Sequence, residues 1–133
     1  MKYLLDTNIC IYIIKKEPKK VLEYFTNKKP GDILISAITV AELYYGVTKS
    51  TKQNQNLVAM EEFLQPFVIA EFNQAASVAY GVLRAQLERK GSVIGSMDML
   101  IAATAISDNC ILVTNNEKEF KRIENLTIEN WTK

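Results

Sequence analysis

The chain has 133 residues, of which 48% are hydrophobic and 23% charged, and its formal net charge is +1. These values exclude a disordered or fibrous chain, and the length suits one domain spanning residues 1–133. The chain contains no histidine, which excludes His-based acid–base catalysis, His metal ligands and Ser-His-Asp triads, so any metal ion would have oxygen ligands, which points to Mg²⁺ or Mn²⁺.

Apolar runs and turn residues predict strands that alternate with helices. The first half should contain, in order, a strand over 2–6, a helix capped by Thr7 or Asn8 and ending near Lys16, a helix from Pro18 to about Asn27, a turn over 29–32, a strand over 33–36, helices over 39–48 and about 52–64, and a strand over 67–70. The second half should contain the longest helix over 74–90, ended by Gly91, then a loop to Gly95, a helix over 96–108 capped by Ser96, a strand over 110–114, a helix over 117–122 and an edge strand over 126–128.

This alternation is typical of α/β proteins in which helices cover both faces of a parallel sheet. In open sheets of this kind, ligands bind outside the carboxyl ends of the strands. Asp6 ends the first strand and Asn115–Asn116 follow the strand over 110–114, while Glu42 and Asp98 are expected in the first turns of helices. These four positions, with Asn115–Asn116 taken as one, are therefore predicted to converge on one rim of the sheet.

The N-terminus does not resemble a secretion signal, because Asp6 and Asn8 interrupt its apolar stretch, and no apolar run is long enough to span a membrane. Cys10 and Cys110 lie in separate apolar runs and form no CxxC pair, which predicts buried free thiols in a reducing compartment. We therefore expect a cytoplasmic protein.

Three acidic residues, Asp6, Glu42 and Asp98, stand in stretches that otherwise read as buried. A buried carboxylate normally survives only when it is paired, hydrogen-bonded or bound to a metal, and no Lys or Arg lies beside these three in sequence. Each also has a structural explanation: Thr39 and Glu42 match a capping box, Asp98 could complement a helix dipole, and Asp6 could form an Asx turn. The coincidence of all three on one rim favours a shared cation.

Six lysines and only two acids lie between Lys15 and Lys29. Such a segment could contact a phosphate backbone, and a solvated helix face explains it equally well.

Four motifs in order along the chain resemble the PIN-domain ribonucleases of the VapC toxin type. They are Leu4-Leu5-Asp6-Thr7-Asn8, the segment from Ile38 to Gly46 around Glu42, the segment from Ile94 to Ala103 around Asp98, and the segment from Leu112 to Phe120 with Thr114-Asn115-Asn116. Any one motif is weak, whereas four in register are specific, and the resemblance covers the whole chain.

The resemblance implies a three-layer α/β/α domain with a central parallel sheet and a Mg²⁺-dependent endoribonuclease activity, with Mn²⁺ as a substitute. It also implies a homodimer, a VapB-type antitoxin from the same operon and operator DNA binding through that antitoxin. Asp6, Glu42 and Asp98 match the three acidic positions of the family, and Asn116 matches a fourth that is Asp in many members. Thr7 and Thr114 match hydroxyl positions near the site, and Thr104 stands where many members have His.

The chemistry of these residues agrees with that assignment. Asp6 and Asp98 are the expected metal ligands, direct or through water, and Glu42 could orient or deprotonate the attacking water. Attack by water would leave a 5′-phosphate and a 3′-hydroxyl, and the anticodon loop of initiator tRNA is the expected target by resemblance. Thr7 and Thr114 could donate hydrogen bonds to carboxylates or phosphate.

Three other classes of protein share single features of this pattern. An aspartyl phosphatase would require a second Asp where Asn8 stands, and a phosphoacceptor signalling domain would carry its Asp in a central strand well into the chain. Asn116 would suit a catalytically inactive binding module, but the three intact acids argue against one.

Overall fold

The computed structural model describes residues 1–133 and has one five-stranded parallel sheet with strand order β3-β2-β1-β4-β5. The strands are short: β1 (Tyr3–Leu5), β2 (Ile33–Ser36), β3 (Val68–Ala70), β4 (Ile111–Val113) and β5 (Ile128–Glu129). The last strand of the chain lies at an edge of the sheet, as the sequence predicts, and the first strand lies at the centre.

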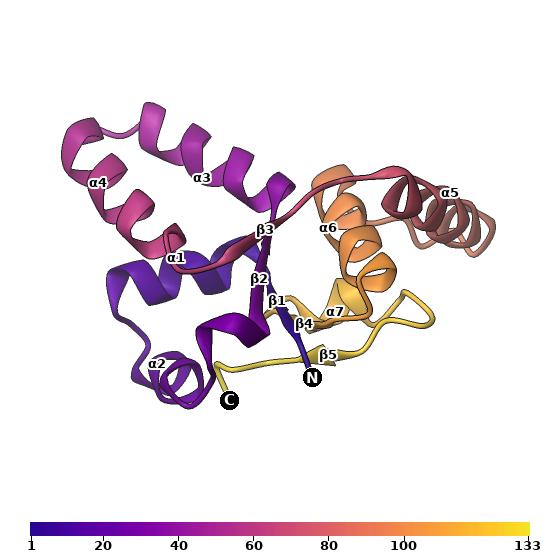
Figure 1. Ribbon diagram of the computed structural model, residues 1–133. Helices are drawn as coiled ribbons and strands as arrows, with labels where there is room; N and C mark the ends of the chain where they lie inside the picture. The colour runs from indigo at the N-terminus through magenta and orange to yellow at the C-terminus, as the bar shows by residue number, and fades with distance from the viewer.

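Helices cover both faces of this sheet (Figure 1). On one side lie α1 (Thr7–Lys15), α2 (Lys19–Thr26), α3 (Ala37–Thr48) and α4 (Gln53–Leu64). On the other side lie α5 (Gln74–Arg89), α6 (Ser96–Ser107) and the short α7 (Glu117–Phe120). The predicted three-layer α/β/α architecture is confirmed, and none of the helices is long and apolar enough to cross a membrane.

Each face of the sheet has its own hydrophobic core. Successive side chains of a strand point to opposite faces, so Leu4 and Leu112 pack with α5 and α6, whereas Leu5 and Val113 pack with α1 to α4. Both faces of the central strands are therefore apolar, which is why these strands read as continuous apolar runs. Cys10 and Cys110 are free and buried, one in each core, as predicted.

Three helix starts differ from the prediction, and in two of them, α1 and α3, a strand leads into the helix without an intervening loop. The cap of α1 is Asp6, not Thr7 or Asn8, and the cap of α3 is Ser36, whose hydroxyl accepts from the Thr39 N–H at 3.0 Å. The cap of α6 is Gly95, not Ser96. Asp6, directly after β1, and Ser36, the last residue of β2, both have extended backbone angles, so in each case the cap residue connects the strand to the helix.

These caps correct the interpretation of Glu42. Because Ser36 caps α3, the alternative explanation of Glu42 as the capping-box partner of Thr39 does not hold. Glu42 lies in the second turn of the helix, not in the first as predicted. Asp98 does lie in the first turn of α6, and that helix is central, with Ile101 to Ala105 buried. The final strand, β5, begins two residues later than expected and pairs with β4 through Leu112 and Ile128.

Candidate active site

Asp6 is the buried centre of the predicted rim. Its side chain is 5% exposed and lies directly after β1, where it accepts hydrogen bonds from the Thr7 N–H and the Thr114 hydroxyl, both at 2.8 Å. Burial raises the pKa of Asp6, the bonds from Thr114 and Thr7 lower it, and the charge of Glu42 raises it again. Asp6 therefore caps a helix and also presents a carboxylate to the rim.

Glu42 reaches the same rim from α3. Its Oε1 atom accepts a 2.6 Å hydrogen bond from the Thr7 hydroxyl, whose oxygen also lies 3.0 Å from the Thr39 hydroxyl. Thr7 thus fixes the Glu42 carboxylate beside Asp6, although the two acids come from different helices. The hydrogen bonds expected of Thr7 and Thr114 are both made to carboxylates.

Asp98 brings a third carboxylate from the start of α6. Burial raises its pKa to about 6, and the negative charges of Asp6, Glu119 and Glu42 contribute to the same shift. A hydrogen bond with Glu119, which needs one of the two acids to be protonated, favours the neutral form further. The three predicted acids are therefore close enough to repel one another.

Glu119 is a fourth carboxylate that the sequence analysis missed. It lies in the short helix α7, and its Oε2 atom accepts a 3.1 Å hydrogen bond from the Asn116 side-chain amide. Glu117, on the same helix, instead contacts Asn130 and Lys133. The only signal in the sequence is the spacing of three residues from Asn116, which places both side chains on one side of a helical turn.

Asn116 is connected to the rim by hydrogen bonds to Thr114 and Glu119. Its backbone N–H donates to the Thr114 hydroxyl at 2.9 Å, and that hydroxyl donates to Asp6. Its side chain orients Glu119. The preceding residue, Asn115, is exposed and donates through its amide to the Tyr12 hydroxyl at 2.9 Å.

No basic side chain neutralises this cluster. The three ion pairs of the chain are Arg84–Glu88, Lys90–Glu124 and Lys133–Glu117, and none includes a rim carboxylate. Carboxylate oxygens that lack a cationic partner suit a hard divalent ion such as Mg²⁺ or Mn²⁺. As the side chains stand, no three of them form a closed set of ligands around one point, so an ion would be held through one or two carboxylates and through water.

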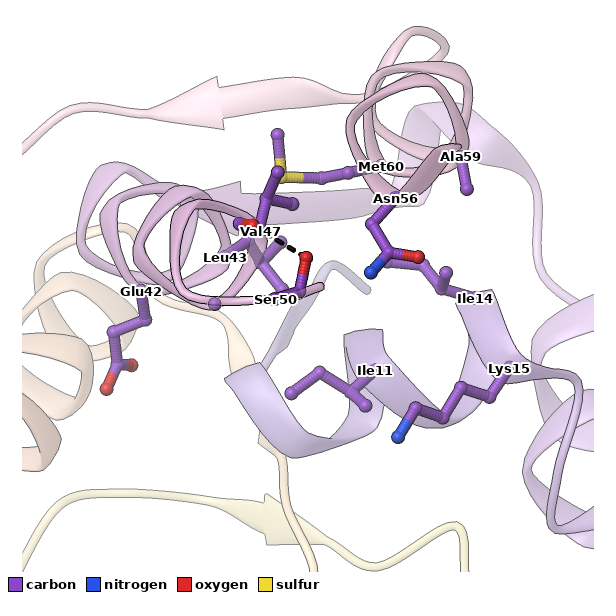
Figure 2. A pocket seen from close by; sticks show the side chains of 11 residues that line it. Ile11, Ile14, Lys15, Glu42, Leu43, Val47, Ser50, Asn56, Ala59 and Met60 are labelled. Atoms are coloured by element: carbon purple, nitrogen blue, oxygen red, sulfur yellow. Dashed lines mark hydrogen bonds between the residues drawn. The ribbon is translucent and has the colours of Figure 1, made fainter. Parts of the chain in front are cut away.

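A cleft of about 320 Å³ opens beside Glu42, between α1, α3 and α4 (Figure 2). Its walls are mainly apolar, and Glu42 and Lys15 lie at its opposite ends. The apolar residues are Ile11, Ile14, Leu43, Val47, Ala59 and Met60.

A parallel sheet with four carboxylates at its carboxyl rim is a fold and site of the PIN-domain type, and the family model described as PIN domain matches residues 3–126. The chain is 50% identical to "Ribonuclease VapC2" of Rickettsia felis over 100% of both chains, and 41% identical to "tRNA(fMet)-specific endonuclease VapC" of Shigella flexneri over 99% of both. Its fold is similar to VapBC2 from Rickettsia felis bound to a DNA fragment from their promoter, with a TM-score of 0.89 and 47% identity over 98% of this chain and 99% of that one. It is also similar to DNA-bound VapBC from Salmonella typhimurium, with a TM-score of 0.92 and 39% identity over 98% of each chain.

The chain belongs to the VapC ribonucleases of the PIN-domain family, as the four sequence motifs predicted. It is accordingly a nuclease of the hydrolase class.

Proposed function

We propose that this protein is the toxin of a type II toxin–antitoxin system and acts as a Mg²⁺-dependent endoribonuclease, with Mn²⁺ as a substitute and with residues 1–133 working as a single PIN domain. The observation that carries the proposal is the group of four carboxylates, Asp6, Glu42, Asp98 and Glu119, which form no ion pair and among which Asp98 has a pKa raised by burial and by the charges of the other three. A divalent cation at such a place would neutralise charge on a phosphodiester and activate water.

The proposed catalytic role of each side chain follows from its surroundings. Asp6 and Asp98 hold the ion, which when bound supplies positive charge for the phosphate and acidifies water. Glu42, fixed by Thr7 at 2.6 Å, orients the attacking water and accepts its proton. Thr114 and Asn116 position Asp6 and Glu119 through their hydrogen bonds. Hydrolysis by this route leaves a 5′-phosphate and a 3′-hydroxyl.

The proposed substrate is RNA, and the proposed target is the anticodon loop of initiator tRNA. This target is supported by the similarity to the tRNA(fMet)-specific endonucleases of Shigella flexneri and Salmonella typhimurium, at 41% and 40% identity over nearly the whole chain. A single-stranded loop can present its backbone to a rim of this kind more easily than a paired stem can.

The proposed protein partner is a VapB-type antitoxin that covers the rim. The apolar cleft beside Glu42 offers a place for hydrophobic side chains of such a partner (Figure 2). An arginine of the antitoxin at the Glu42 end of the cleft would pair with the rim carboxylates, because a guanidinium binds carboxylates in fork geometry. The toxin–antitoxin complex would then bind operator DNA through the antitoxin, as the DNA-bound VapBC structures of Rickettsia felis and Salmonella typhimurium suggest.

The proposed assembly of the toxin is a homodimer. Exposed apolar side chains on α3 and α5 supply surface for a second copy: Tyr45 is 66% exposed, Val78 63% and Val82 55%. Light scattering of the purified protein at several concentrations tests this assembly, and a monomer throughout would contradict it.

The test of the activity uses purified protein, total tRNA and transcribed initiator tRNA. Cleavage should appear with millimolar Mg²⁺, disappear with excess EDTA and return when Mg²⁺ is restored. Mapping of the fragment ends should give a 5′-phosphate within the anticodon loop. Cleavage that persists in EDTA would contradict metal dependence, and cuts that lie only in other RNAs would contradict the proposed target.

The test of the toxin role is made in cells. Expression of the wild-type chain alone should arrest growth, and co-expression of the antitoxin from the same operon should restore it. The Asp98→Asn variant, expressed to the same level, should be harmless. A wild-type chain that is harmless at high expression would contradict the toxin role even if the enzyme cleaves RNA in vitro.

A further inference from the structure

Positive charge is concentrated where α1 ends and α2 begins. Lys15, Lys16, Lys19 and Lys20 are all exposed, and none of them takes part in an ion pair. Glu17 is the only acid in this segment. Four unpaired lysines at this density attract a polyanion. We call these four side chains the α1–α2 lysine surface.

Tyr12 and Asn115 connect the α1–α2 lysine surface to the catalytic rim. Asn115 directly follows Thr114, which is bonded to Asp6, and its amide donates to the Tyr12 hydroxyl at 2.9 Å. A hollow of about 420 Å³ lies beside Tyr12 and is also lined by Lys15, Glu17 and Pro18. Because α1 starts at the rim and rises 1.5 Å per residue, Lys15 lies only about 13 Å along the helix from Asp6.

The rim itself cannot supply the affinity for RNA. Its four carboxylates repel phosphates, and a bound divalent ion offsets only part of that charge. Binding energy for a polyanion must therefore come from cations outside the rim. The α1–α2 lysine surface offers them without competition from internal ion pairs.

Building on the proposed ribonuclease function, we infer that Tyr12, Asn115 and the α1–α2 lysine surface bind single-stranded RNA on one side of the phosphate that is cleaved. The lysines contact phosphates, and the Tyr12 ring stacks on an unpaired base. Asn115 sets the orientation of that ring through the hydroxyl. An acidic protein segment could also bind the lysines, but the direct connection to the rim through Asn115 and Tyr12 favours the RNA strand that is cleaved there.

The first test neutralises part of the lysine surface. Lys15→Gln/Lys16→Gln should raise KM for RNA cleavage in Mg²⁺ and leave kcat close to wild type. It should also reduce the dependence of log KM on log salt concentration, by about 0.7 for each phosphate contact that is lost. Lys49→Gln/Lys52→Gln, which removes equal charge at the end of α3 and before α4, is the matched control and should leave both quantities unchanged.

The second test separates the ring of Tyr12 from its hydroxyl. Tyr12→Leu should weaken RNA binding between about 5-fold and 150-fold, the range expected for loss of one stacked base. Tyr12→Phe keeps the ring and should lose much less. Melting temperatures near wild type for both variants ensure that binding, not folding, is being compared.

A parallel binding measurement distinguishes failure of this inference from failure of the proposed function. Anisotropy of a fluorescent single-stranded oligoribonucleotide in EDTA reports binding without cleavage. A wild-type protein that binds but never cleaves would contradict the ribonuclease proposal alone. Lysine variants with wild-type affinity and salt dependence would overturn the inference, as would variants that weaken only inhibition by the antitoxin.

Discussion

The side-chain amide of Asn116 donates a 3.1 Å hydrogen bond to the carboxylate of Glu119. The backbone N–H of Asn116 donates in turn to Thr114, and the Thr114 hydroxyl donates to Asp6. One asparagine therefore links two carboxylates, one after the central strand and the other on α7. An amide can do this because it donates, whereas an aspartate at position 116 would repel Glu119.

We expect Glu119→Gln to lower metal affinity or cleavage about 10-fold to 100-fold, the usual range for loss of a group that supports metal ligands. The substitution keeps the volume of the side chain and removes a charge beside Asp98. Glu117→Gln is the matched control, because Glu117 lies on the same helix and contacts Asn130 and Lys133. Mn²⁺ titration calorimetry and cleavage rates measure both variants, and equal losses would show that α7 acts only structurally.

Asp98→Asn and Asp6→Asn should each remove most RNA cleavage while the fold is retained, since a neutral amide is a much poorer ligand for a hard cation. Asp108→Asn, at the opposite end of α6 from Asp98, is the control and should cleave at the wild-type rate. Cleavage assays in Mg²⁺ with circular dichroism of each variant provide the measurement. Near wild-type activity in either rim variant would rule out its assignment.

The metal-free protein should be less stable at neutral pH than near pH 5. The pKa of Asp98 is about 6 in the folded chain against an ordinary value of 3.8, and the pKa of Asp6 is raised as well. Between these values the folded state binds more protons than the unfolded state, so the free energy of unfolding falls as pH rises to about 6. Melting temperatures in EDTA at both pH values measure this, and Asp98→Asn should shrink the difference.

Divalent ions should reverse that loss at neutral pH, because they bind the folded state. Adding millimolar Mn²⁺ should raise the melting temperature near pH 7.5 and have little effect near pH 5, where Asp98 is largely protonated. If Mn²⁺ leaves the melting temperature unchanged at both pH values, the rim carboxylates serve only as helix caps and hydrogen-bond acceptors.

Thr114→Val should destabilise the protein by about 1–3 kcal/mol, because the buried hydroxyl bonds both the Asp6 carboxylate and the Asn116 N–H. It should also raise the pKa of Asp6 further, since this hydrogen bond holds that pKa down. Thr104→Val removes an equally buried hydroxyl that bonds only the Leu100 carbonyl. Urea unfolding of both variants at pH 5 and 7.5 gives the comparison, and a pH-independent loss in Thr114→Val would contradict its link to Asp6.

The sequence by itself determined the order of the elements, the parallel sheet and the three acids Asp6, Glu42 and Asp98. The strands are buried on both faces, so they stand out in the sequence as short apolar runs bounded by turn residues, and their order along the chain can be read directly. The acids stood out because a charge within such a run is costly unless it has a partner. Motif order then sufficed to indicate the family.

Only the tertiary structure decided which side chains complete the rim. Glu117 and Glu119 are two residues apart on α7 and therefore face about 200° apart, and the spacing from Asn116, the one local signal, does not show that Glu119 turns toward Asp98. Thr114 reaches Asp6 across 108 residues of sequence, and Thr7 reaches Glu42 across 35. Hydrogen bonds of this length in sequence follow from strand register and helix placement, which form only when both hydrophobic cores pack against the sheet.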